Sequence, residues 1–241
     1  MPTSVRAVRA EPHTAPRPRG AVALLTGSLA YATLTVAYVV TNRATPQPDA
    51  PGGDVLRHVR DHGTAIDLGA FLLLVAAVLL VPVAATLARL VRQGEGQGRG
   101  AAAATVLAGG VPAGGALAAS AALSWTLGRL PEQAPADLAR SLADLSFLAG
   151  GVGYAVSFAL LAAGACLAAR GSGLLPRARI TTGLVIAAAG LTATLSLVVP
   201  DFGYLLPVVR FGGTAWLVWA AFALVRPRPA TAGVDAPGGN A

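Results

Sequence analysis

Two histidines and an aspartate in one short segment have the spacing of a metal site. His58 and His62 are four residues apart, and Asp54 precedes His58 by the same interval. On a helix this spacing places the three side chains on one face, where two imidazoles and a carboxylate could bind zinc together with a water molecule. Arg57 and Arg60 stand between these ligands and oppose a bound cation. Ordinary interfacial histidines, and pH sensing by imidazole protonation, are the alternatives to a metal site.

Arg210 interrupts the last apolar stretch, 202–225. A charge at membrane depth costs about 3 kcal/mol or more, so it must be paired, reach the headgroups or face water. Three acids at the ends of apolar stretches are predicted to lie at a similar depth: Asp67, Asp144 and Asp201. One interpretation is a structural ion pair, or an Arg210 that extends to the headgroups. The other is an outward-facing polar pocket that binds a small ligand or couples protons.

Glycines flank a proline in the middle of the third apolar stretch, at 109–115. Pro112 removes a backbone donor and the glycines weaken the helix further, which predicts a kink or a break. Broken helices at mid-membrane depth form substrate sites in transporters. Gly110 and Gly114 also have the GxxxG spacing with which membrane helices pack closely. The stretch therefore predicts either tight helix packing or a hinge for gating.

The sequence lacks the residues that several classes of enzyme and cofactor-binding protein require. All eighteen basic residues are arginine, so no lysine can form a Schiff base. The three histidines lie outside the long apolar stretches, which excludes a haem held by two histidines within the membrane. The sequence has no HExxH motif, no phosphate-binding loop and no histidine near the serine of 171–173. We therefore expect no catalytic activity and no cofactor, and we interpret the single cysteine, Cys166, as a packing residue.

The composition is typical of a membrane protein. Of the 241 residues, 54% are hydrophobic and 12% are charged, whereas a soluble domain carries about 25% charged residues. The mean hydropathy is +0.63. These values exclude a disordered chain, a nucleic-acid-binding domain and an ordinary soluble enzyme. They predict an all-α fold, a polytopic bundle of membrane-spanning helices.

Charged residues divide the chain into six stretches long enough to cross a bilayer, which takes about 20 apolar residues in a helix. The predicted spans are 20–42, 67–89, 101–127, 145–169, 180–200 and 204–225. They form one domain, 20–226, whose longest loop, 43–66, carries a short helix at 54–63. The segments 1–19 and 227–241 lack a hydrophobic period, which is typical of disordered tails. The first span has 23 uncharged residues, too many for the apolar region of a signal peptide.

The arginines determine the predicted orientation. With the amino terminus inside the cell, the inner segments hold twelve of the eighteen arginines, and eight of the eleven acids lie outside. Basic residues accumulate on the cytoplasmic side of membrane proteins. Both termini are therefore predicted to be cytoplasmic.

Short motifs at the helix ends resemble those of a group of small membrane proteins. They are the Gly-Leu-Leu-Pro-Arg stretch at 173–177, followed by Gly183, the histidine-bearing loop 56–68 and the glycine-rich third span. Over about residues 20–226 the chain is similar to an uncharacterised family of six-span bacterial, mainly actinobacterial, integral membrane proteins. The resemblance implies a six-span helical protein of the bacterial plasma membrane. It implies no catalytic or binding residue.

These features predict a role without catalysis. The first hypothesis is a binding, sensing or assembly component of the plasma membrane, whose partners are the lipid bilayer and a second copy or another membrane protein. The alternative is a small transporter or exporter subunit with an outward-facing polar pocket around Arg210. Such a subunit would work as a homo-oligomer joined through its glycine-rich third and fourth spans. Neither hypothesis involves nucleic acid.

Overall fold

The computed structural model describes residues 19–46, 50–93, 98–170 and 172–225. Within these ranges all regular structure is helical, and six helical stretches are long and apolar enough to cross a membrane. They are Arg19–Thr41, Gly63–Gln93, Arg99–Gly128, Ala136–Ala169, Arg177–Leu197 and Pro200–Val225. The predicted all-α fold with six membrane-spanning helices is confirmed. The two predicted tails lie outside the described residues, apart from Arg19.

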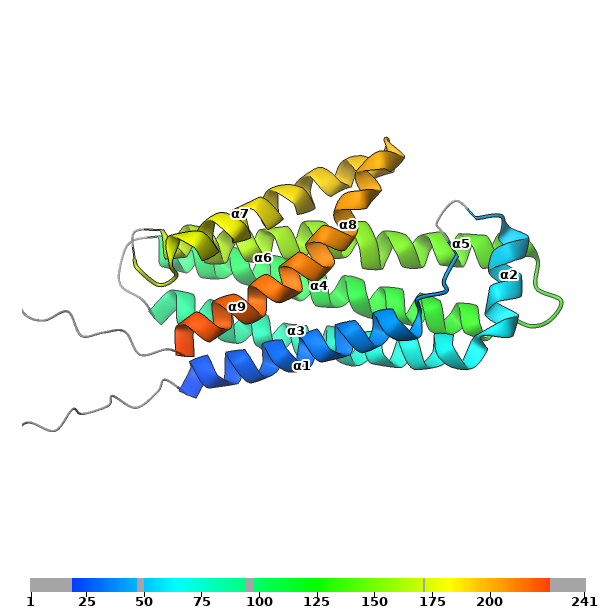
Figure 1. Cartoon of the computed structure of the whole chain (residues 1–241), viewed down its shortest axis with the longest axis horizontal. Coiled ribbons are helices and arrows are strands. Elements are labelled where there is room, and N and C mark those ends of the chain that lie inside the picture. The colour runs from blue at the N-terminus through cyan, green and yellow to red at the C-terminus, as the bar shows by residue number, and fades with distance from the viewer. Residues whose placement is uncertain (1–18, 47–49, 94–97, 171, 226–241) are drawn as a thin grey trace, which may run out of the picture.

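The helices are joined by short connections. In chain order they are α1 (Arg19–Thr41), α2 (Gly52–Asp61), α3 (Gly63–Gln93), α4 (Arg99–Gly128), α5 (Ala136–Phe147), α6 (Tyr154–Ala169), α7 (Arg177–Thr192), α8 (Leu205–Pro207) and α9 (Gly213–Val225). Two π-helical turns, Leu148–Gly153 and Val208–Gly212, join α5 to α6 and α8 to α9. Two 3₁₀ turns, Ala193–Leu197 and Pro200–Tyr204, form the tip between α7 and α8. α1 begins and α9 ends at the same end of the bundle, and α2 lies across the opposite end (Figure 1).

Three of the spans are longer than a bilayer crossing requires. α3 and α4 have 31 and 30 residues, or about 45 Å at 1.5 Å per residue, whereas the hydrocarbon core is about 30 Å thick. The fourth span was predicted to begin at 145, after its last acid, but its helix already begins at Ala136. Asp137 and Asp144 therefore lie on the same helical stretch, Ala136–Ala169, as the fourth apolar segment. Charge indicates where a membrane ends, and a helix can continue beyond that point.

A small hydrophobic core holds α2 across the ends of these long helices. Its buried members are Val55, Val59, Ile66, Leu127 and Ala139. The short helix predicted for this loop is present as α2, displaced two residues toward the amino terminus. Two arginines connect it further: Arg60 donates to the carbonyl of Glu132, and Arg140 donates to the carbonyl of Ala50. The α2 end is thus a packed cap of four helices.

Glycines bring α4 into backbone contact with both of its neighbours. A Cβ at Gly109 would lie 2.2 Å from the backbone nitrogen of Leu161 in α6. A Cβ at Gly110 would lie 2.2 Å from the Cβ of Ala84 in α3, and Gly114 faces α3 as well. The predicted GxxxG pair therefore packs within the chain, and its surface is occupied by α3.

The break predicted at Pro112 does not occur. α4 is one helix from Arg99 to Gly128 with Pro112 inside it. Pro112 lies on an exposed side of the helix, while the glycines on the other sides are held against α3 and α6. Membrane helices tolerate proline in this way because neighbouring helices and local adjustments compensate for the lost hydrogen bond.

Large aromatic side chains fill the main core. Tyr31, Tyr154, Phe158 and Trp216 are among its largest fully buried side chains. The hydroxyl of Tyr31 donates to that of Tyr154 at 2.9 Å, which ties α1 to α6. Cys166 is buried in the same core, in agreement with its interpretation as a packing residue.

Candidate functional site

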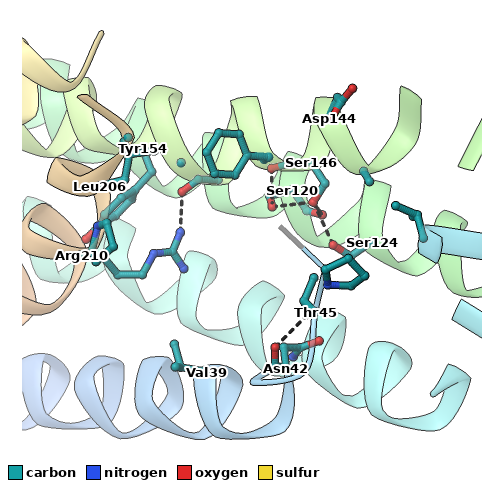
Figure 2. A pocket seen from close by; sticks show the side chains of 18 of the residues that line it. Val39, Asn42, Thr45, Ser120, Ser124, Asp144, Ser146, Tyr154, Leu206 and Arg210 are labelled. Atoms are coloured by element: carbon teal, nitrogen blue, oxygen red, sulfur yellow. Dashed lines mark hydrogen bonds between the residues drawn. The ribbon is translucent and has the colours of Figure 1, made fainter. Parts of the chain in front are cut away.

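A cavity of about 860 Å³ lies in the half of the bundle that α2 covers. Its wall is built from α1, the loop after it, α2, α4, α5, the first π turn, the start of α6 and the segment 200–211, with one residue each from α3 and the first 3₁₀ turn. The wall is largely apolar, and polar side chains project from several of its helices (Figure 2). They include Tyr38, Ser120, Ser124, Ser146, Tyr154 and Arg210.

Arg210 extends from the last span into this cavity (Figure 2). Its Nη2 donates to the carbonyl of Gly150. The guanidinium carbon lies 5.2 Å from the ring centre of Tyr154 and 5.7 Å from that of Tyr38. Aromatic faces attract a cation by about 0.5–2 kcal/mol each, which offsets part of the cost of a charge at this depth. Arg210 thus lines a cavity, and its predicted role in binding a ligand stays a prediction.

Both residues of the Arg210–Gly150 contact lie in π turns. Arg210 belongs to Val208–Gly212 and Gly150 to Leu148–Gly153. Such turns are rare and are frequent at functional sites, because the extra residue redirects the groups that follow. A Cβ at Gly150 would lie 2.5 Å from Oγ of Ser120, so glycine is what lets this turn approach α4. Two irregular turns thus meet across one contact in the cavity wall.

Two of the acids predicted to accompany Arg210 are paired elsewhere. Both carboxylate oxygens of Asp144 accept from Nε of Arg140 at 2.9 Å, and Asp144 points away from Arg210 in Figure 2. Asp67 lies 3.5 Å from Arg129 in a partly exposed ion pair and is not part of the cavity wall. The structure brings Asp144 to the cavity without pairing it to Arg210.

Asp201, the third acid, lies in the cavity wall and is exposed. Within the described ranges, no carboxylate oxygen lies within 4.0 Å of the Arg210 guanidinium. The predicted structural ion pair is therefore absent from this part of the chain. The cavity instead contains a cation held by a carbonyl and by two aromatic rings.

Three serines form a polar cluster in the cavity wall (Figure 2). One of them, Ser120, lies next to Gly150, whose carbonyl accepts from Arg210. Oγ of Ser120 donates to the carbonyl of Ser146 at 2.9 Å, and Oγ of Ser124 lies 2.9 Å from Oγ of Ser146. Sequence reasoning did not identify these residues, nor Tyr38 and Tyr154. The spacing of Ser120 and Ser124, one helical turn in an apolar span, was the available signal.

The predicted metal ligands do not form a metal site. The rings of His58 and His62 stack with centres 4.5 Å apart, and Asp54 forms an ion pair with Arg57 at 3.3 Å. In the described residues no three His, Cys, Asp or Glu side chains are placed to hold a metal ion. His58 lines the cavity, whereas His62 does not.

The protein is expected to lose some thermal stability as the pH falls from 7 to 5. Burial, the largest cause, and the nearby His62 lower the pKa of His58, while Asp61 opposes them. The folded state thus disfavours the protonated imidazole, so its contribution to stability is present above about pH 6.5 and is lost as the pH falls through the lowered pKa. We expect a decrease in Tm of a few degrees at most, because the side chain is partly exposed. The variant His58→Gln should show a smaller decrease, and an equal decrease in both proteins would exclude His58 as the cause.

Comparisons with known proteins do not assign a function to this cavity. No protein-family model, no curated protein and no solved structure matches the chain. The membership suggested by the helix-end motifs therefore stays a prediction.

Proposed function

We propose that this multi-pass membrane protein is a non-catalytic binding component of the bacterial plasma membrane, and that it binds a small molecule in the Arg210 cavity. The observation that carries the proposal is a cation, without a carboxylate partner among the described residues, in a cavity of about 860 Å³. Binding sites for small molecules have volumes of about 300–1,000 Å³ and combine apolar walls with a few polar groups. A charge within a membrane span is costly and is usually a functional residue.

The α2 end of the bundle is proposed to face the outside of the cell. The opposite end, where α1 begins, carries Arg19, Arg89, Arg92, Arg99, Arg170, Arg177 and Arg179 at the helix ends. That excess of basic residues supports a cytoplasmic location. The cavity would then open toward the outer side, and both termini would be cytoplasmic.

Two observations favour binding over transport. Tyr31 and Tyr154 are each 1% exposed and hydrogen-bonded to each other, so the core beside the cavity is closed toward the cytoplasmic end. The glycines expected to join copies of a transporter subunit are used inside the chain, against α3 and α6. A transporter needs a second opening toward the cytoplasm. This arrangement instead supports a binding site with a single opening.

Thermal unfolding of the purified protein tests the proposal. The probes are metal ions, lipids, and small lipophilic or anionic metabolites, each added singly to protein in a neutral detergent. A ligand that binds only the folded state stabilises it by about 2.7 kcal/mol at 100 times its Kd. The variant Gly203→Phe should lose this response, because Gly203 lines the cavity and a Cβ there would have no atom within 4 Å.

Gly115→Phe is the matched control. Gly115 lies on the exposed side of α4, also with open space around a Cβ, and does not line the cavity. This variant should respond to ligand as the original protein does. A flat response to every probe, or an undiminished response in Gly203→Phe, would contradict the proposed binding function.

A further inference from the structure

The guanidinium of Arg210 has unused hydrogen-bonding capacity that faces the cavity. Arginine carries five N–H donors in a planar fork. One nitrogen donates to the Gly150 carbonyl, and no other residue of the described ranges accepts a hydrogen bond from this side chain. The rings of Tyr38 and Tyr154 also face the guanidinium, but an aromatic face accepts no strong hydrogen bond. The free part of the fork matches a carboxylate or a phosphate, which arginine binds through two parallel bonds.

The other charges of the cavity wall do not cancel this preference for an anion. Arg140 and Asp144 neutralise each other through two hydrogen bonds of 2.9 Å. His58 is partly buried in a position that disfavours its protonated form. Asp201 also lines the cavity but is exposed, and solvent and salt screen an exposed charge more than a buried one. Arg210 is thus the dominant charge of the inner part of the cavity.

The remaining wall suits an apolar body attached to that anion. Val39, Phe147, Leu206 and Phe211 line the cavity around the polar groups. Phe211 is 45% exposed, and Val208, one helical turn away and outside the cavity wall, is 50% exposed, so this wall borders the exposed apolar surface of the last span. A ligand could therefore reach Arg210 from the bilayer with its hydrocarbon part along this wall. A small hydrophilic anion would gain nothing from the apolar surface.

From these features we infer that the ligand is an anionic amphiphile, with a carboxylate or phosphate group on Arg210 and a hydrocarbon chain along the wall formed by Leu206 and Phe211. The inference rests on the proposed binding function and names the class of ligand. Carboxylate and phosphate heads share the chemistry that Arg210 recognises. A chain of about ten carbons is a suitable probe, because ligands of that size fit sites of several hundred Å³.

The test compares four probes by thermal unfolding of the full chain in a neutral detergent: decanoate, decyl phosphate, decanol and inorganic phosphate. Decanoate, decyl phosphate or both should stabilise the protein, and the response says which head is preferred. Decanol and inorganic phosphate should bind at least about 30-fold more weakly, because each lacks one half of the ligand. Arg210→Gln should weaken the binding of the charged amphiphiles at least about 30-fold. Arg129→Gln, at an exposed arginine outside the cavity wall, should leave that binding unchanged.

Each outcome has a definite meaning. Binding of decanol equal to that of decanoate would overturn the inference and leave the proposed binding function in place. If inorganic phosphate binds as tightly as the charged amphiphiles, the inference is overturned, and the ligand is a free anion without a hydrocarbon chain. No response to any of these probes, together with a flat response to the wider set, would overturn both. If Arg210→Gln fails to fold, the comparison of decanoate with decanol on the original chain still decides, and Arg210→Lys tests the loss of the two-bond contact without loss of charge.

Discussion

Replacing Gly109 with leucine is expected to lower the free energy of unfolding by about 3 kcal/mol or more, at the upper end of the cost of overpacking a core. A Cβ at this position would lie 2.2 Å from the backbone nitrogen of Leu161 and 2.5 Å from the carbonyl oxygen of Ser157. Both of these atoms are backbone atoms of α6, so no side-chain rotation can relieve the overlap. The helices α4 and α6 would have to separate, and each contributes residues to the cavity. Tm in detergent and the fraction of monodisperse protein measure the effect.

Gly115→Leu is the matched control on the same helix. A Cβ there would meet no atom within 4 Å, and leucine has a helix propensity about 1 kcal/mol better than glycine. This variant should be as stable as the original protein or slightly more stable. Equal losses of stability in the two variants would mean that α4 does not pack on α6 through Gly109. The close contact between α4 and α6, which positions the cavity residues of both helices, would then not exist in the protein.

The six spans could be predicted because a bilayer imposes a simple rule on composition. Long uncharged stretches must be helices, since no other partner is available for their backbone groups in lipid. The rule does not give the start of the helix that carries the fourth span, because Asp144 ends the apolar stretch but not the helix. The missing donor of Pro112 and its flanking glycines led to the expectation of a break, but α4 remains one helix whose glycines pack against α3 and α6.

The cavity could be predicted only in part. Arg210 was identified because a lone charge in an apolar stretch is conspicuous, but its partners depend on tertiary structure. The acids at the span ends were the expected partners, whereas the carbonyl of Gly150 and the ring of Tyr154 hold the guanidinium. The sequence does not indicate which backbone carbonyl a π turn will leave free to accept a hydrogen bond. The serine cluster was missed for a similar reason, since Ser146 joins it from a different helix.

Thiol labelling tests the central claim most directly, the claim that the cavity opens toward the outside of the cell. The single cysteine, Cys166, is fully buried at 0% exposure, so the original chain should not react. Ser124→Cys places a thiol in the cavity wall. Gln93→Cys places one on an exposed position at the opposite end of the bundle and serves as the matched variant.

A membrane-impermeant maleimide is added to intact cells and, in parallel, to lysed cells. We predict that Ser124→Cys reacts in intact cells, and that Gln93→Cys reacts only after lysis. Because labelling is close to all or none across a membrane, the expected difference is large. If Gln93→Cys but not Ser124→Cys is labelled in intact cells, the orientation is the reverse of the proposed one. A Ser124→Cys thiol that stays unreactive even after lysis would contradict an open cavity around Arg210.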